Sequence, residues 1–360
     1  MTSITRFAAK CARQKTRSCK KSPARPPASY HVLVAIPMAM KLDVRGLTVE
    51  LPTEAGWIRP VNDVSFSLAG GETLGIVGES GSGKTMLSLA LMGLDPPGSR
   101  RTGEAWLETR DGGRMNLVAA AGEELRGMRG RDIAMIFQEP MTALDPVMRI
   151  GAQVEEPIRV HDARAGAAEI RGRAIDALKR AAVPEPERRA RQYPHQLSGG
   201  LRQRVMIAMA IATSPGILIA DEPTTALDVT VQKQILELLA QLRRDLQLSM
   251  LFITHDLGVV SQIADRVMVM YAGRIVEDGP TAEVLRHPQH PYTKGLLRAA
   301  PRLERGKITP IPGTVPALGA LPSGCAFGPR CDVHISDCDA AVPELRSVTQ
   351  DHQARCILIS

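Results

Sequence analysis

The sequence predicts an α/β fold with a mainly parallel sheet, and three observations support this prediction. Short apolar runs of strand length alternate with helix-like stretches from about residue 42 onward. Chains that alternate strands and helices in this way form parallel sheets covered on both faces. A glycine-rich turn joins one of these strands to the helix that follows it. The chain has 360 residues, of which 44% are hydrophobic, and it can therefore bury a large core.

The predicted elements follow one another in a regular order. Strands are predicted at residues 41–51, 64–68, 73–77, 133–137, 217–220 and 250–254, and a hairpin is predicted around Ala272-Gly273. Helices are predicted at residues 85–92, 201–212 and about 231–242. Residues 151–193 are polar and rich in helix formers, which indicates an inserted α-helical subdomain over about residues 140–205. Nine of the 26 prolines lie in the last 80 residues, where a small irregular C-terminal module is expected.

The positive charge of the chain is concentrated in an N-terminal tail. The formal net charge of the chain is +7. Residues 1–40 contain eight basic and no acidic residues, so the remaining 320 residues have a net charge of −1. The tail is interpreted either as a segment upstream of a translation start at Met38 or Met40, or as a targeting or membrane-surface segment. A neutral body with 3% aromatic residues argues against binding to nucleic acid. The expected domains are therefore residues 1–40, 41–285 and 286–360.

The most specific short motif matches the P-loop pattern G-x-x-x-x-G-K-[ST]. It reads Gly78-Glu79-Ser80-Gly81-Ser82-Gly83-Lys84-Thr85. The glycines allow backbone N–H groups to point at phosphate oxygens, and the helix that follows offers its positive N-terminal end to the same anion. Lys84 is expected to reach the β- and γ-phosphates and Thr85 to bind Mg²⁺. The motif predicts a nucleoside-triphosphate site.

Two further motifs suit the chemistry of such a site. An apolar strand, residues 217–220, is followed by the two carboxylates of Asp221 and Glu222. Asp221 suits the coordination shell of Mg²⁺, and Glu222 suits a general base that activates water. Ser198-Gly199-Gly200 opens an apolar helix and makes a second anion site. Since one nucleotide rarely needs two such sites, this second site is predicted to contact a γ-phosphate held by another subunit.

Taken in order, these motifs resemble the nucleotide-binding subunit of an ABC transporter. The stretch Leu197–Gly200 matches the signature sequence of that family, and Gln138, Asp228 and His255 match its loop glutamine, dimer-interface loop and switch histidine. The resemblance implies a P-loop NTPase fold with an N-terminal antiparallel β subdomain. It also implies two ATPase subunits stacked head to tail, with ATP between the P-loop of one and the signature of the other.

The resemblance assigns roles residue by residue. It implies catalytic roles for Glu222, His255, Gln138 and Lys84, and Mg²⁺ contacts from Thr85, Asp221 and Gln138. It implies that Ser198, Gly199, Gly200 and Gln203 contact ATP held by the other subunit, and that Asp228 lies at the dimer interface. Trp57 is the candidate for stacking on adenine, with an exposed loop tryptophan as the alternative interpretation.

The C-terminal module contains four cysteines, Cys325, Cys331, Cys338 and Cys356. The stretches Gly324–Cys331 and His290–Thr293 resemble the C-terminal extension of oligopeptide and dipeptide importer ATPases. Four thiolates in a proline-rich segment suit a [4Fe–4S] cluster, with Zn²⁺ or four reduced thiols as alternatives.

The resemblance implies an ATPase subunit that powers import of di- or oligopeptides from the cytoplasmic face of the inner membrane. The expected partners are two integral membrane permeases, a second and similar ATPase, and an extracytoplasmic solute-binding protein. The alternatives are an importer ATPase for nickel or glutathione, or a soluble ABC-type ATPase of a phosphonate-degradation complex. A DNA-repair ATPase is disfavoured by the neutral body.

Overall fold

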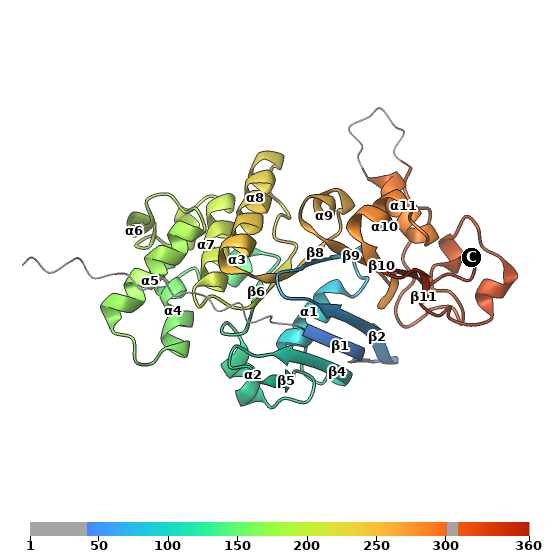
Figure 1. Ribbon diagram of the computed structural model, residues 1–360, viewed down its shortest axis with the longest axis horizontal. Helices are drawn as coiled ribbons and strands as arrows, with labels where there is room; N and C mark the ends of the chain where they lie inside the picture. Colours follow the sequence, from blue (N-terminus) through green and yellow to red (C-terminus); the bar gives the residue numbers. More distant parts are fainter. Residues whose placement is uncertain (1–41, 301–308, 360) are drawn as a thin grey trace, which may run out of the picture. The chain divides into compact units, whose positions relative to one another are not determined.

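The computed structural model describes residues 42–300 and 309–359, and the tail predicted at residues 1–40 lies outside them. The described chain forms two β-sheets (Figure 1). The smaller sheet is antiparallel, with strand order β2-β1-β4-β5. Its strands are β1 (Leu42–Thr53), β2 (Gly56–Leu68), β4 (Arg100–Glu108) and β5 (Arg114–Asn116). This sheet is the antiparallel β subdomain that the family resemblance implies.

The larger sheet has the strand order β11-β12-β10-β9-β3-β8-β7-β6. Its parallel part contains β3 (Thr73–Val77), β6 (Ile133–Ile136), β7 (Ile217–Asp221), β8 (Ser249–Thr254) and β9 (Arg266–Tyr271). Strand β10 (Arg274–Pro280) turns back from β9 as the predicted hairpin and pairs with it antiparallel. The predicted α/β fold with a mainly parallel sheet is confirmed.

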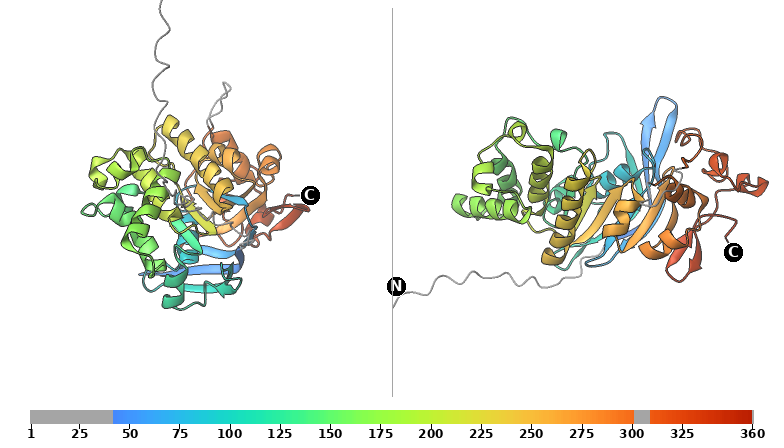
Figure 2. Two further views of the ribbon diagram at one scale, coloured as in Figure 1. Left: turned by 60° about the vertical axis from the view of Figure 1, so that its left-hand side comes forward. Right: turned by 90° about the horizontal axis from the view of Figure 1, so that it is seen from above.

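Two apolar cores cover the two faces of the parallel strands. Ile76 and Ile219 pack into the core shared with the antiparallel sheet and helix α1 (Lys84–Met92). Val77 and Leu218 belong to the core on the opposite face, which includes α8 (Val229–Leu246) and α9 (Leu257–Ile263). Figure 2 shows these yellow and orange helices and the blue strands of the smaller sheet on opposite sides of the parallel strands. Burial on both faces explains why these strands are short uninterrupted apolar runs.

A group of helices lies between β6 and β7 in the sequence. After α2 (Gly122–Met128), which precedes β6, come α3 (Pro140–Ala143), α4 (Ile150–His161), α5 (Ala167–Arg180), α6 (Pro186–Arg189), the 3₁₀ turn Pro194–Gln196 and α7 (Gly199–Ile211). Buried apolar residues of α4, α5 and α7 join the same core as α8 and α9. None of the helices in the described ranges is long and apolar enough to cross a membrane.

The C-terminal segment, residues 281–300 and 309–359, is less irregular than its composition indicates. It contains α10 (Thr281–Arg286), α11 (Pro291–Ala299), the 3₁₀ turns Gly328–Arg330 and Ser336–Asp339, and strands β11 (Arg346–Thr349) and β12 (His352–Ala354). Strand β12 pairs with β10 and so extends the larger sheet. The buried carboxylate of Glu277 on β10 accepts a 2.8 Å hydrogen bond from His352 and further bonds from the backbone N–H groups of Gln289 and His290. These contacts attach the C-terminal segment to the sheet.

Candidate nucleotide-binding site

The glycine-rich loop lies between β3 and α1, where it is packed too tightly for larger residues at two positions. A Cβ atom on Gly78 would lie 2.3 Å from the carbonyl oxygen of Met270. Gly83 has φ +104°, and a Cβ atom there would lie 2.0 Å from the carbonyl oxygen of Pro60. Since a side chain at either position would collide with backbone, both positions require glycine. The tight packing holds the loop directly in front of α1, with the helix N-terminus available to an anion.

Lys84 is held inside this loop by backbone carbonyl groups. Its Nζ donates to the carbonyl oxygens of Gly78 at 2.7 Å and Glu79 at 3.0 Å. Burial lowers the pKa of Lys84, while the nearby carboxylates of Glu222 and Asp221 oppose this effect. The lysine therefore places an ammonium group in the curve of the loop, where a phosphate would be bound.

The carboxylate of Asp221, at the end of β7, has the features of a metal ligand. Its Oδ1 is buried and has no hydrogen-bond partner within the described chain. Burial raises the pKa of Asp221 to about 6, whereas a hydrogen bond with Thr85 lowers it. A buried carboxylate oxygen left unpaired is costly unless a cation or donor satisfies it. Asp221 and Thr85 therefore fit a Mg²⁺ site, because both supply the oxygen ligands that this ion prefers.

Glu222 follows Asp221 and is contacted by three side chains from different parts of the sequence. Its carboxylate lies 3.3 Å from Nδ1 of His255 and accepts a hydrogen bond of 3.4 Å from Nε2 of Gln138. The hydroxyl of Thr225 donates to it at 2.7 Å. Three predicted residues thus meet at one carboxylate, and Thr225 adds a contact that the sequence analysis did not identify.

The backbone of Glu222 is in the left-handed region, with φ +47°. A glutamate rarely adopts this conformation, which costs on the order of 1–3 kcal/mol and is concentrated at functional sites. The backbone N–H of Glu222 donates to the carbonyl of Ile253 on β8 at 2.9 Å. This bond holds the strained residue against the strand that leads to His255.

The signature loop and the loop that contains Asp228 lie beside each other at the starts of α7 and α8. Ser198 caps α7 by accepting from the N–H of Leu201, and Asp228 caps α8 by accepting from the N–H of Val231. A Cβ atom on Gly200 would lie 2.8 Å from Cγ1 of Val231, so glycine permits this close approach.

Ser198, Gly199 and Asp228 are exposed, whereas the side chain of Gln203 is 2% exposed and faces the interior. The loop can therefore present Ser198 and Gly199 to another molecule. Gln203 is buried in this conformation and therefore cannot contact another molecule together with Ser198 and Gly199.

Trp57 lies near the start of β2 and is 43% exposed. The guanidinium carbon of Arg100 lies 3.9 Å from the centroid of its ring, a cation–π arrangement. Pro60, three residues further along the same strand, packs against Gly83 of the phosphate loop. The strand therefore passes beside the loop, and the assignment of Trp57 to adenine stacking stays a prediction.

The four C-terminal cysteines are free thiols that line one small pocket. Burial raises the pKa of Cys325 and Cys331, which favours the protonated thiols. In the described ranges, no group of three or more His, Cys, Asp and Glu side chains is arranged to hold a metal ion. The cysteines therefore converge as the sequence analysis anticipated, but their arrangement here does not fit a resident [4Fe–4S] cluster or Zn²⁺.

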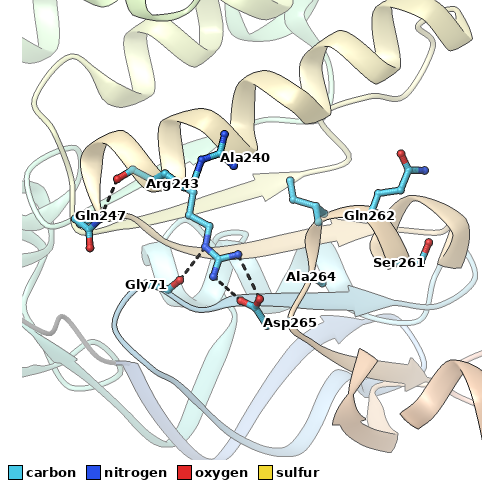
Figure 3. Close-up of a pocket in the computed structure, with 10 residues that line it drawn as sticks. Gly71, Ala240, Arg243, Gln247, Ser261, Gln262, Ala264 and Asp265 are labelled. Atoms are coloured by element: carbon cyan, nitrogen blue, oxygen red, sulfur yellow. Dashed lines mark hydrogen bonds and ion pairs between the residues drawn. The ribbon is translucent and has the colours of Figure 1, made fainter. Parts of the chain in front are cut away.

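A cavity of about 520 Å³ lies away from the phosphate loop, between the C-terminal ends of α8 and α9 (Figure 3). Arg243 points into it, donates to the carbonyl of Gly71 at 2.8 Å and forms an ion pair with Asp265 at 2.6 Å. The charge of Arg243 is therefore already neutralised within the protein. The geometry around Glu222 and Lys84, rather than the volume of this cavity, identifies the chemical site.

Two parts of the chain match known protein families. Residues 61–225 match the family described as "ABC transporter", and residues 276–338 match the "Oligopeptide/dipeptide transporter, C-terminal region". A putative peptide import ATP-binding protein of Brucella melitensis is 52% identical over 326 residues, covering 88% of this chain and 96% of that protein.

Two solved structures resemble the described fold. One is an ATP-binding cassette in a dimeric post-hydrolysis state bound to ADP and Pi, with a TM-score of 0.59 and 30% identity, covering 67% of this chain and 98% of that one. The other is cbiO1 of Clostridium perfringens, part of an ABC transporter complex, with a TM-score of 0.55 and 28% identity, covering 68% of this chain and 90% of that one.

Proposed function

Because this chain belongs to the family of ABC transporter ATP-binding proteins and is an ATPase, we propose that it energises the import of di- or oligopeptides. The match of residues 276–338 to the oligopeptide/dipeptide transporter C-terminal region and the peptide-import relative in Brucella melitensis both favour this substrate class. The convergence of Gln138, His255 and Thr225 on the carboxylate of Glu222 is the observation that carries the ATPase assignment.

In this proposal, each residue of the site has a distinct task in ATP hydrolysis. The phosphate loop and Lys84 bind the phosphates, and Glu222 accepts a proton from the attacking water. Gln138 and Thr225 orient the carboxylate, and His255 contacts the γ-phosphate. Asp221 and Thr85 would hold Mg²⁺, which neutralises phosphate charge when it is bound. The chemistry consists of positioning and electrostatic stabilisation, without a covalent enzyme intermediate.

The exposed signature loop supports a site completed by a second ATPase subunit. Ser198 and Gly199 lie at the N-terminus of α7, where they offer donors to an anion. Asp228 lies beside them at the start of α8 and would take part in the same interface. A solved relative is dimeric in a post-hydrolysis state, which favours this arrangement.

An apolar groove next to the site supports docking of a membrane permease. The groove has a volume of about 350 Å³ and is lined by Phe137, directly after β6, and by residues of α4 and α7 such as Val160 and Met209. Phe137 is 40% exposed and Val160 is 66% exposed. A permease helix in this groove would contact Phe137. The next residue in the chain, Gln138, donates a hydrogen bond to Glu222. The chain would then be peripheral to the cytoplasmic face of the inner membrane.

Affinity purification of the tagged full chain from solubilised membranes tests this proposal. We expect two integral membrane permeases and a second ATPase to be retained, and the ATPase activity of the complex to rise when peptide-loaded solute-binding protein is added. Val160→Asp should release the permeases without loss of ATP binding, whereas Val342→Asp, at an exposed position of the C-terminal segment, should retain them. Retention of soluble proteins alone would contradict the transport function.

The four cysteines are free thiols in the arrangement described here, and the peptide-import proposal does not depend on them. Binding of a [4Fe–4S] cluster or Zn²⁺ by Cys325, Cys331, Cys338 and Cys356 would require the side chains to rearrange from the positions described here. Absorbance near 400 nm and metal analysis of anaerobically purified protein distinguish a cluster, zinc and free thiols.

A further inference from the structure

The C-terminal segment contacts the phosphate loop through a buried arginine. Arg330 lies in the 3₁₀ turn between Cys325 and Cys331, and its side chain is 4% exposed. Its guanidinium donates two hydrogen bonds to the carboxylate of Glu79, of 2.6 and 3.1 Å. Glu79 is the second residue of the phosphate loop and precedes Arg330 by 251 residues. Paired bonds between arginine and a carboxylate fix orientation as well as charge.

Other contacts hold both partners of this ion pair in place. Arg330 also donates to the carbonyl of Pro312 at 2.9 Å. The fully buried phenol of Tyr292, at the start of α11, accepts a hydrogen bond of 2.7 Å from the backbone N–H of Glu79. Tyr292 packs against Tyr271 and Phe327, with ring centroids 4.6 and 5.4 Å away.

The backbone N–H, the carbonyl and the carboxylate of Glu79 therefore all have hydrogen-bond partners. Its N–H is bonded to Tyr292, its carbonyl to Lys84 and its carboxylate to Arg330. The C-terminal segment therefore holds the same residue that Lys84 contacts within the loop.

We propose that Arg330 and Tyr292 are positioning residues for ATP binding, because Arg330 neutralises the Glu79 carboxylate and Tyr292 fixes the Glu79 backbone within the phosphate loop. This inference rests on the proposed nucleotide site and is independent of the transported solute. Without Arg330, the carboxylate of Glu79 is unpaired beside the anion site, and its charge repels the phosphates of ATP. Loss of Arg330 should therefore weaken ATP binding and leave the groups around Glu222 that activate water unchanged.

The test measures the affinity of the full chain for ATP, and KM and kcat for ATP in the assembled complex, for Arg330→Met. We expect the affinity to fall about tenfold, which corresponds to about 1.4 kcal/mol, because the unpaired carboxylate of Glu79 repels the phosphates. KM should rise while kcat stays close to that of the wild type. Arg330→Lys should recover part of the affinity. Arg298→Met is the matched control, because Arg298 forms an exposed ion pair with Asp332 in the same segment and should leave ATP affinity unchanged.

A double variant separates positioning from a loss of folding. Combining Arg330→Met with Glu79→Gln removes the repelling charge, so the double variant should bind ATP more tightly than Arg330→Met alone. Thermal unfolding of each variant reports folding independently. The proposal is overturned if folded Arg330→Met binds ATP like the wild type, or if Glu79→Gln gives no recovery. If Lys84→Ala also left ATP affinity unchanged, the nucleotide site itself would be misassigned.

Discussion

Glu222 combines a strained backbone conformation with a carboxylate that accepts several hydrogen bonds. Its left-handed backbone is held by the 2.9 Å bond to Ile253, and its carboxylate receives bonds from Thr225 and Gln138. Because each contact comes from a different element, the direction of the carboxylate depends on how β6, β7 and β8 are placed in the sheet. Such preorganisation favours proton transfer from a correctly placed water.

Thr225→Ala removes the shortest bond to this carboxylate and should slow ATP hydrolysis. A side-chain hydrogen bond to a charged group is worth about 1.5–3 kcal/mol, and we expect kcat to fall roughly tenfold or more with ATP affinity retained. Thr225→Ser keeps the hydroxyl and should restore most of the rate. Steady-state ATPase assays of the complex check this. Equal rates for the alanine variant and the wild type would show that Thr225 does not orient the base.

Sequence reasoning named Gln138 and His255, which the structure brings to the carboxylate of Glu222, but it missed Thr225. Glu222, Gln138 and His255 each follow an apolar strand, and the carboxyl ends of neighbouring parallel strands meet at one edge of the sheet. Thr225 was missed because a threonine in a turn has no distinctive sequence pattern. Its position three residues after Glu222 could have indicated a hydrogen bond to that carboxylate. The burial of Gln203 could not be predicted, since its polar side chain gives no indication of facing the core.

At the level of elements, helix α11 depends on a buried histidine at its N-terminus. Nδ1 of His290 accepts a hydrogen bond of 3.0 Å from the N–H of Tyr292 and must therefore be unprotonated. Burial lowers the pKa of His290 to about 3, and the charges of Lys294 and Arg355 act in the same direction. The cap that holds Tyr292 against the phosphate loop is therefore sensitive to acid.

The sign of this sensitivity follows from the lowered pKa. Between pH 6.5 and about 3, the unfolded chain binds a proton at His290 that the folded protein does not, so stability falls as the pH falls through this range. From pH 6.5 to pH 5 the loss should be about 2 kcal/mol, at about 1.4 kcal/mol per unit.

Urea unfolding at both pH values measures this loss. His290→Asn keeps an acceptor for Tyr292 without a titrating group and should lose less stability than the wild type. The control, His334→Asn, changes a histidine whose side chain is 33% exposed and should retain the wild-type dependence. Identical dependence in His290→Asn would contradict the role of this cap.

The elements differed in how well the sequence predicted them. Strands β3, β7 and β8 were found within a residue at their ends, because burial on both faces produces clear apolar runs. The first half of β2 was missed, since exposed residues and Pro60 interrupt its pattern. The strands β11 and β12 were also missed, because they are short and lie in a proline-rich segment.

At the scale of the whole described chain, the C-terminal segment and the phosphate loop form one unit. The Arg330–Glu79 pair joins residues 251 positions apart, and the Glu277–His352 pair attaches the same segment to the sheet. Periodicity and motifs describe local structure, so neither contact could be read from the sequence. The C-terminal segment therefore contacts the loop that is proposed to bind ATP. The same segment contains the match to peptide transporters.

The central claim is that the phosphate loop binds Mg·ATP and that Glu222 is the base for its hydrolysis. The most direct measurement compares Glu222→Gln with the wild type for ATP affinity and for turnover in the assembled complex. We predict unchanged affinity and a kcat lower by about 10²–10⁴-fold, the usual contribution of a general base. Wild-type turnover by Glu222→Gln, or no ATP binding by the folded wild-type chain, would contradict the claim.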